Sequence, residues 1–170
     1  LLYYSGTHSL EFNYIGLEKP GGWFFFIAFG IKCGFPVLHT WLTETYPKTS
    51  VTGIIFLSIF TTKAAIYALA RGFPGTEIMI YIGAVMACFP ILYAVIENDL
   101  RKVLTYSQIN QLGFMVCGIG VGTTLGLNGA VAHVFADVLC KALLFMSMGA
   151  VLQRVGHTLG SDLGGLYRTM

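Results

Sequence analysis

The sequence predicts an all-helical protein that crosses a membrane several times, and two observations lead to this fold class. Of the 170 residues, 55% are hydrophobic and only 11% are charged, whereas a soluble domain carries about 25% charged residues. Long apolar stretches also alternate with short polar breaks along the chain. The net charge of +2 is too small to indicate a nucleic-acid partner, so we expect the lipid bilayer to be the main environment.

The apolar stretches are long enough to span the hydrocarbon core, which requires about 20 residues. They cover residues 22–42, 51–70, 77–97, 103–122 and 126–152. The breaks between them are short and rich in turn-forming or charged residues, so consecutive spans should be antiparallel. We expect one membrane domain over residues 1–170, and we interpret the chain as an internal part of a longer protein.

The distribution of basic residues predicts an orientation. In a five-span arrangement two basic residues fall on one side, Lys19 and Arg71, and five on the other: Lys48, Arg101, Lys102, Arg154 and Arg168. Basic residues are enriched in cytoplasmic loops. The loops at 43–50 and 97–102 should therefore face the cytoplasm.

Lys32 and Pro36 stand close together inside the first apolar stretch. Lys32 is about ten residues from either end, which is roughly 15 Å at 1.5 Å per residue, and its side chain is too short to reach water from that depth. Proline lacks the N–H that would bond to the carbonyl of Lys32 and so breaks the helix there. Irregular backbone at this depth requires protein or a wet cavity around it, so the pair indicates a hydrated pocket. The alternative is a packing kink with an incidental lysine.

Lys63 lies near the middle of the second stretch. An unpaired lysine in a low-dielectric environment loses part of its preference for the charged form, which a proton carrier needs. The alternative is that Lys63 pairs with an acid outside this chain.

His133, Asp137 and Lys141 follow one another at intervals of four in the last stretch. On a helix they share one face, and Asp137 and Lys141 can form an i, i+4 pair. Titratable residues in a row through an apolar span are typical of a proton relay. A structural ion pair is one alternative. Haem ligation by His133, with His39 as a second ligand, is another.

The fourth stretch opens with polar residues that either line water or pack the helix: Thr105, Ser107, Gln108, Asn110 and Gln111. We regard His39, Ser107 and Gln108 as possible water-lining residues. The four cysteines are scattered and lack metal-ligand spacing. No phosphate-binding motif occurs, so we expect no metal, no cofactor and no catalytic site within the chain itself.

Four segments together resemble one known family: GIKCGFPVLHTWLTETYP, TTKAAIYALAR, ENDLRKVLTYSQINQLGFM and HVFADVLCKALLFMSMGAV. This is the family of antiporter-like, proton-translocating membrane subunits found in Mrp-type cation/proton antiporters and in respiratory complex I. The resemblance covers about residues 22–166, and within the family it is strongest to the D-type subunit of Mrp antiporters. It implies a larger helical bundle built from inverted repeats.

The resemblance also implies roles for single residues. Lys32 matches the family's lysine on a broken helix, Lys63 its connecting lysine and Lys141 the lysine of its central axis. His133 matches a histidine, while Asp137 stands where many members carry a second histidine. A glutamate that partners the first lysine, and a terminal lysine or glutamate, would lie outside this chain.

The resemblance therefore implies proton translocation within a multi-subunit cation/proton antiporter of the bacterial inner membrane. Its partners would be other membrane subunits, protons and possibly Na⁺. The alternative is a proton-pumping subunit of a complex I-type NADH:quinone oxidoreductase, whose redox cofactors would lie on other subunits. A structural subunit with inactive channels is a third possibility.

Overall fold

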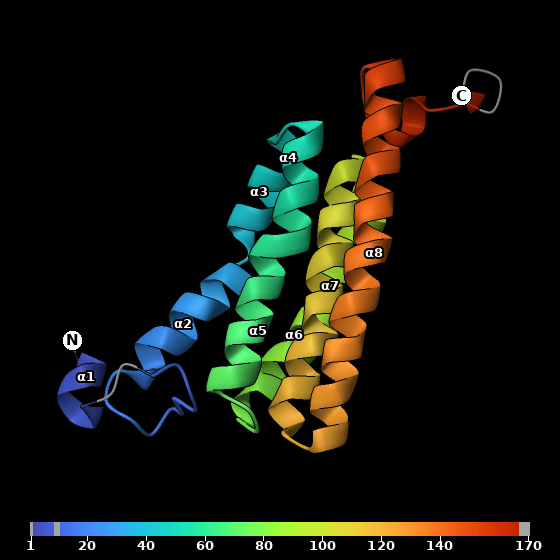
Figure 1. Cartoon of the computed structure of the whole chain (residues 1–170). Coiled ribbons are helices and arrows are strands. Elements are labelled where there is room, and N and C mark those ends of the chain that lie inside the picture. Colours follow the sequence, from blue (N-terminus) through green and yellow to red (C-terminus); the bar gives the residue numbers. More distant parts are fainter. Residues whose placement is uncertain (1, 9–10, 167–170) are drawn as a thin grey trace.

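The computed structural model describes residues 2–8 and 11–166, and most of them are helical (Figure 1). Among these residues the only extended pairing is an isolated bridge between Asp99 and Leu159. The predicted all-α fold class is thus confirmed. The helices in chain order are α1 (Leu2–Thr7), α2 (Gly22–Cys33), α3 (Thr40–Lys48), α4 (Val51–Phe56), the π-helical segment η1 (Leu57–Thr61), α5 (Thr62–Gly72), α6 (Ile78–Ile96), α7 (Leu100–Val121), α8 (Thr124–Val155) and the short 3₁₀ helix η2 (Gly160–Asp162).

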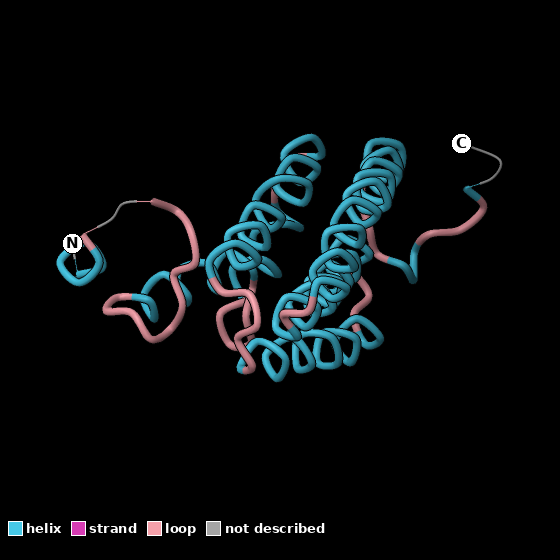
Figure 2. Tube along the Cα trace, turned by 60° about the horizontal axis from the view of Figure 1, so that its bottom comes forward, coloured by secondary structure: helices cyan, strands magenta, loops and turns pink. Residues whose placement is uncertain are grey.

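The longer helices form a bundle from which α2 leans away (Figures 1 and 2). Helices α6 and α7 make the most extensive contact, and α8 packs on α7 and α4. The close approach of α6 and α7 depends on glycine: a Cβ on Gly113 would lie 2.5 Å from the backbone nitrogen of Ala87, and one on Gly83 would lie 2.7 Å from that of Cys117. Small residues of this kind let membrane helices approach closely.

Within the described residues, three helical segments are long and apolar enough to cross a membrane: Val51–Gly72, Ile78–Ile96 and Thr124–Val155. Helix α7 has 22 residues but carries the polar row noted above. The α2–α3 region is divided into two shorter helices. The prediction of five spans with the boundaries given above stays a prediction.

The break predicted at Pro36 is present and extends from Gly34 to His39. Gly34 ends α2 in the left-handed conformation, with φ of 83°, which favours glycine. The backbone N–H groups of Gly34 and Phe35 both donate to the carbonyl of Gly30, each at 2.9 Å. Val37 also has a positive φ of 71°, which is strained for a β-branched residue.

One end of the bundle is tied together by polar contacts. Arg101 at the start of α7 donates from Nη2 to the carbonyl of Thr49 at 2.7 Å. The Asp99 carboxylate accepts from the hydroxyl of Thr158 at 2.8 Å. The loops that we predict to be cytoplasmic therefore lie at the same end as the chain that follows α8. Arg168, which also entered that prediction, lies outside the described residues.

Candidate functional site: a buried polar row between helices

Lys63 and Asp137 form a buried ion pair between α5 and α8. Lys63 Nζ lies 2.8 Å from Asp137 Oδ2, and the two residues are 7% and 5% exposed. Lys63 Nζ also donates to the carbonyl of Ser58 at 2.9 Å. Ser58 belongs to η1, and π-helical turns of this kind occur often at functional sites. Lys63 is therefore solvated by a carboxylate and a carbonyl in the middle of an apolar segment.

The partner of Asp137 differs from the i, i+4 partner considered for it in the sequence. Lys141 instead donates to the hydroxyl of Ser107 on α7 at 2.6 Å, although it still interacts electrostatically with Asp137. Asp137 thus pairs with Lys63 on the neighbouring helix α5, and not with Lys141, which lies one turn away on α8. Within this chain the acid that pairs with Lys63 is Asp137.

His133 completes the row on α8, where its Nε2 lies 2.8 Å from Oε1 of Gln111. A cavity of about 260 Å³ between α7 and α8 connects these groups. It is lined by Ser107, Gln111, His133, Ala136, Asp137, Cys140, Lys141 and Leu144. A space of this size can hold several water molecules, each of which needs about 30 Å³. The predicted face of His133, Asp137 and Lys141 is thus turned toward polar groups of α5 and α7.

The polar residues of α7 divide into two groups. Ser107, Gln108 and Gln111 face the buried row, and Gln108 donates from Nε2 to the Thr62 hydroxyl at 3.4 Å. Its Oε1 is buried and accepts no hydrogen bond from the described residues. Thr105 instead bonds within α7 to the carbonyl of Arg101. Asn110 bonds to the carbonyl of Ala87 on α6 and so packs the helix, which is the alternative role considered for these polar residues.

The side chain of Lys32 is exposed, and it borders a groove of about 400 Å³. The groove is lined by Phe29, Lys32, Phe60, Thr61, Ala64, Ala65 and Ala68. Lys32 Nζ lies 5.9 Å from the centre of the Trp41 ring, within the range of a cation–π interaction. His39 makes an edge contact with Phe89, with ring centres 5.2 Å apart, and does not line the cavity of Lys141. The described residues contain no cluster of three or more potential metal-ligating side chains.

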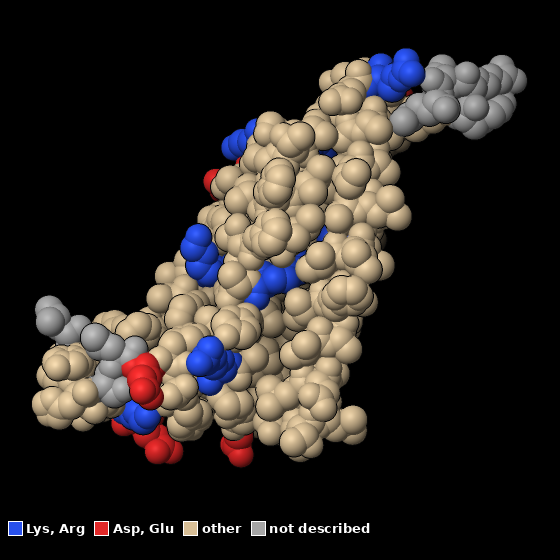
Figure 3. All heavy atoms as spheres, viewed as in Figure 1, with Lys and Arg blue, Asp and Glu red and all other residues tan. Residues whose placement is uncertain are grey.

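Charged side chains are distributed unevenly over the surface (Figure 3). Acidic atoms appear near the two ends of the face shown, whereas basic atoms also appear at mid-height, surrounded by uncharged residues. A charged group among the apolar residues of a membrane-spanning helix needs solvation by protein groups or by water.

Comparison with known proteins places these residues in a family. The family model described as "NADH:quinone oxidoreductase/Mrp antiporter, TM" matches residues 10–170. The chain belongs to this family. The resemblance read from the four sequence segments is therefore confirmed.

Among known proteins, the chain is similar to subunits of dehydrogenases and to subunits of Na(+)/H(+) antiporters. The chain is 35% identical over 158 residues to F(420)H(2) dehydrogenase subunit L of Methanosarcina mazei, covering 86% of this chain and 23% of the relative. It is 33% identical over 157 residues to the D-type subunit of the Na(+)/H(+) antiporter of Alkalihalophilus pseudofirmus, covering 85% of this chain and 31% of the relative. Among solved structures, the Mrp complex from Dietzia sp. DQ12-45-1b contains a similar chain with a TM-score of 0.73 and 28% identity, covering 77% of this chain and 26% of that one. The chain thus spans about a quarter to a third of the length of these relatives.

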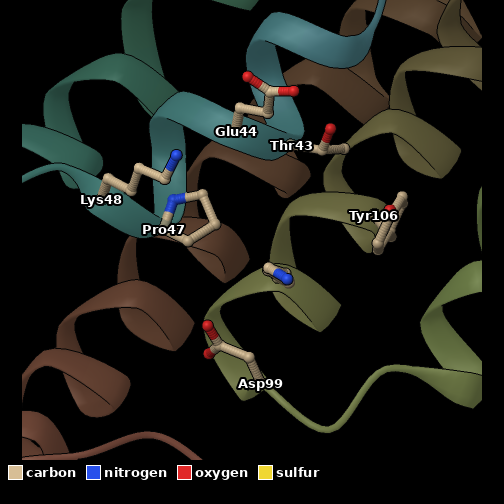
Figure 4. A pocket seen from close by; sticks show the side chains of 7 residues that line it. Thr43, Glu44, Pro47, Lys48, Asp99 and Tyr106 are labelled. Carbon is tan, nitrogen blue, oxygen red and sulfur yellow. The ribbon is translucent and has the colours of Figure 1, made fainter.

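This family member also carries a charged pocket at the tied end of the bundle, which the sequence did not suggest (Figure 4). The pocket has a volume of about 570 Å³ and lies between α3 and the start of α7. Its lining combines acids and bases: Thr43, Glu44, Pro47, Lys48, Asp99, Lys102 and Tyr106. Lys102 is also paired with Glu97 at 3.4 Å. The pocket is large enough to hold water beside the first turns of α7.

Two functional features escaped prediction from the sequence. Ser58, whose carbonyl accepts a hydrogen bond from Lys63, lies in η1, and the segment LSIFT has no recognisable signal for a π-helical turn. Trp41 donates from Nε1 to the carbonyl of Ile31 at 2.7 Å. The sequence signal for this contact is indirect: a break in a helix leaves carbonyls that need other hydrogen-bond donors.

Proposed function

We propose that this protein is a proton-translocating membrane subunit of a multi-subunit cation/proton antiporter. The observation that carries the proposal is the buried ion pair of Lys63 and Asp137 beside the cavity of Lys141. Buried ionisable residues are costly in a membrane and usually serve transport or proton transfer. Family membership supports the same conclusion, since one relative is named as part of a Na(+)/H(+) antiporter.

In this mechanism, protons pass through Lys32, Lys63 and Lys141 by way of water and polar side chains. Lys32 would receive its solvation and its acidic partner from helices outside this chain. Lys63 exchanges its proton against the attraction of Asp137. Ser107 and Gln111 hold Lys141 and His133 toward the cavity, where water would continue the path.

Such a proton path can couple proton flow to transport only in a sealed membrane that holds a proton gradient. The proposal therefore places the protein in the bacterial inner membrane as a multi-pass subunit, with lipid and other membrane subunits as its neighbours. Protons are the proposed transported ions, with Na⁺ as the ion exchanged by the assembled complex.

A second function is favoured by the similarity to a dehydrogenase subunit. The same buried row would then move protons in a complex driven by a redox reaction, as in a complex I-type NADH:quinone oxidoreductase. Proton uptake that requires a reductant would indicate this function, whereas uptake coupled to an outward Na⁺ gradient would indicate antiport.

The test of the proposed function is Lys32→Ala in the assembled complex, assayed as proton movement in everted membrane vesicles. We expect proton movement to be lost while assembly persists, because Lys32 is exposed on this chain and its truncation leaves the buried core of the bundle unchanged. Lys32→Arg should also be poorly active, because arginine does not release its proton. Lys19→Ala, which changes a lysine outside the helices, is the control. Normal transport by the Lys32→Ala complex would overturn the proposal for this residue.

A further inference from the structure

We propose that Trp41 and Tyr46 are positioning residues that couple the break between α2 and α3 to the π-helical segment η1. The inference rests on the proposed function, because its purpose would be to link Lys32 to the ion pair of Lys63. Each of the two segments is a place where the regular backbone hydrogen bonding of a helix is interrupted.

Trp41 closes the first interruption. Its indole N–H donates to the carbonyl of Ile31 across the break at 2.7 Å. The face of the same ring lies 5.9 Å from Lys32 Nζ. One side chain therefore holds the backbone of the break and also contacts the lysine that the break presents.

Tyr46 joins Trp41 to the second interruption. The two rings meet edge to face, with centres 6.1 Å apart and an interplanar angle of 80°. Tyr46 is fully buried, and its hydroxyl donates to the carbonyl of Leu57 at 2.9 Å. Leu57 is the first residue of η1, so a side chain of α3 fixes the start of the π-helical turn.

The π-helical turn in turn holds Lys63. The carbonyl of Ser58, the residue after Leu57, accepts a hydrogen bond from Lys63 Nζ at 2.9 Å, and the other contact of this ammonium is Asp137 at 2.8 Å. A continuous series of contacts thus runs from Lys32 through Trp41, Tyr46 and η1 to Lys63.

The series has a physical basis for transmitting a change of charge. A protonated Lys32 attracts the Trp41 ring, and a neutral Lys32 does not. Release of the ring loosens the bond of its N–H to Ile31 and the edge contact with Tyr46. A change in the Tyr46 hydrogen bond then alters the position of the Ser58 carbonyl, which accepts a hydrogen bond from Lys63.

The first measurement is the rate and pH profile of proton uptake in vesicles for Tyr46→Phe and Trp41→Phe. Each variant keeps an aromatic ring and loses one hydrogen-bond donor, so we expect uptake to fall by roughly two- to tenfold and its pH profile to shift. Because both act in one series, the double variant should be no slower than the slower single variant. Tyr81→Phe, on the exposed face of α6, is the matched control and should match the wild type.

The second measurement does not depend on transport. Cys33 ends α2 and is fully buried, so its reaction with N-ethylmaleimide reports opening of the break. In a background where Cys88, Cys117 and Cys140 are replaced by serine, we expect Tyr46→Phe to accelerate labelling of Cys33 even though its hydroxyl contacts η1 and not the break. Unchanged labelling in Tyr46→Phe, or multiplicative losses of uptake in the double variant, would overturn the coupling.

The two proposals fail in different ways. If Lys32→Ala abolishes uptake while Tyr46→Phe and Trp41→Phe keep wild-type rates and profiles, the coupling is wrong and the proposed function stands. If Lys32→Ala itself transports normally, the proposed function is wrong for Lys32. The Cys33 labelling then still decides whether the two interruptions are mechanically linked.

Discussion

The ion pair of Lys63 and Asp137 is the residue-scale feature on which the proposed transport depends. Separating two such charges in a low-dielectric interior is costly, and leaving one of them unpaired costs about 3–5 kcal/mol. Lys63 can avoid this cost by giving up its proton when Asp137 is removed or neutralised. Asp137 therefore controls how readily Lys63 exchanges its proton, and it need not carry a proton itself.

We predict that Asp137→Asn shifts the pH optimum of transport downward without abolishing transport. The carboxylate favours the charged form of Lys63, so its loss favours the neutral form, and half-protonation then requires a lower pH. A shift of about one pH unit or more is the expected size for the loss of a close opposite charge. The measurement is the pH profile of proton uptake in vesicles, with Asp162→Asn on η2 as the control. An unchanged profile would leave Asp137 with a packing role only.

The titratable residues could be predicted from the sequence because a charge in an apolar stretch is conspicuous in one dimension. Their partners could not. Asp137 was expected to contact Lys141 because both lie on one helix, where spacing is known, while the contact with Lys63 depends on how α5 and α8 pack. Gln111 and Ser58 were missed as partners for the same reason, since the first is a contact between helices and the second a carbonyl exposed by backbone geometry.

At the scale of elements, α7 is the helix that organises the site. One of its faces carries Ser107 and Gln111 toward α8, and another packs closely on α6 through Gly113. The sequence showed that α7 is polar at its start. It did not show which polar residues face the site, because the weak amphipathic pattern of a helix buried on several sides does not define a single face.

Gly113→Val tests this packing. The added side chain would meet backbone atoms of α6, which cannot rotate away as a side chain can. We expect a loss of stability of about 1–3 kcal/mol or more, as for other overpacked interiors, seen as a lower thermal denaturation midpoint of the detergent-solubilised complex. Gly129→Ala on α8 meets nothing within 4 Å and should leave the midpoint unchanged or slightly higher. A Gly113→Val complex as stable as the wild type would mean that α6 and α7 are not packed as described.

At the scale of the whole molecule, the polar loops that connect the helices lie at two opposite ends of the bundle. The contact of Arg101 with Thr49, and that of Asp99 with Thr158, show that three connecting segments lie at the same end. These are the loops at 43–50 and 97–102 and the segment that follows α8. The alternation of spans and short breaks predicted this arrangement. The divergence of α2 from the bundle could not be predicted, because it follows a break in which Gly34 adopts the left-handed conformation.

We predict that this tied end is cytoplasmic, since among the described residues it carries four basic side chains, Lys48, Arg101, Lys102 and Arg154, whereas the opposite side has only Lys19 and Arg71. Single cysteines introduced at Thr45 and Asn98, both exposed, should not react with a membrane-impermeant maleimide added to intact cells, and they should react in everted vesicles. A cysteine at Glu77, between α5 and α6, is the matched position for the opposite end and should show the reverse pattern. Strong labelling of Thr45→Cys or Asn98→Cys from outside would reject the orientation.

The central claim is that protons move through the buried lysines, and Lys141 tests it most directly. It is 3% exposed, lines the cavity between α7 and α8, and is held by Ser107 at 2.6 Å. The measurement is proton uptake by vesicles that contain the complex with Lys141→Ala, with assembly verified by the amount of each subunit. We predict a loss of uptake of about 100-fold or more, as when a proton-transferring group is removed. Uptake at the wild-type rate by a fully assembled Lys141→Ala complex would contradict the claim.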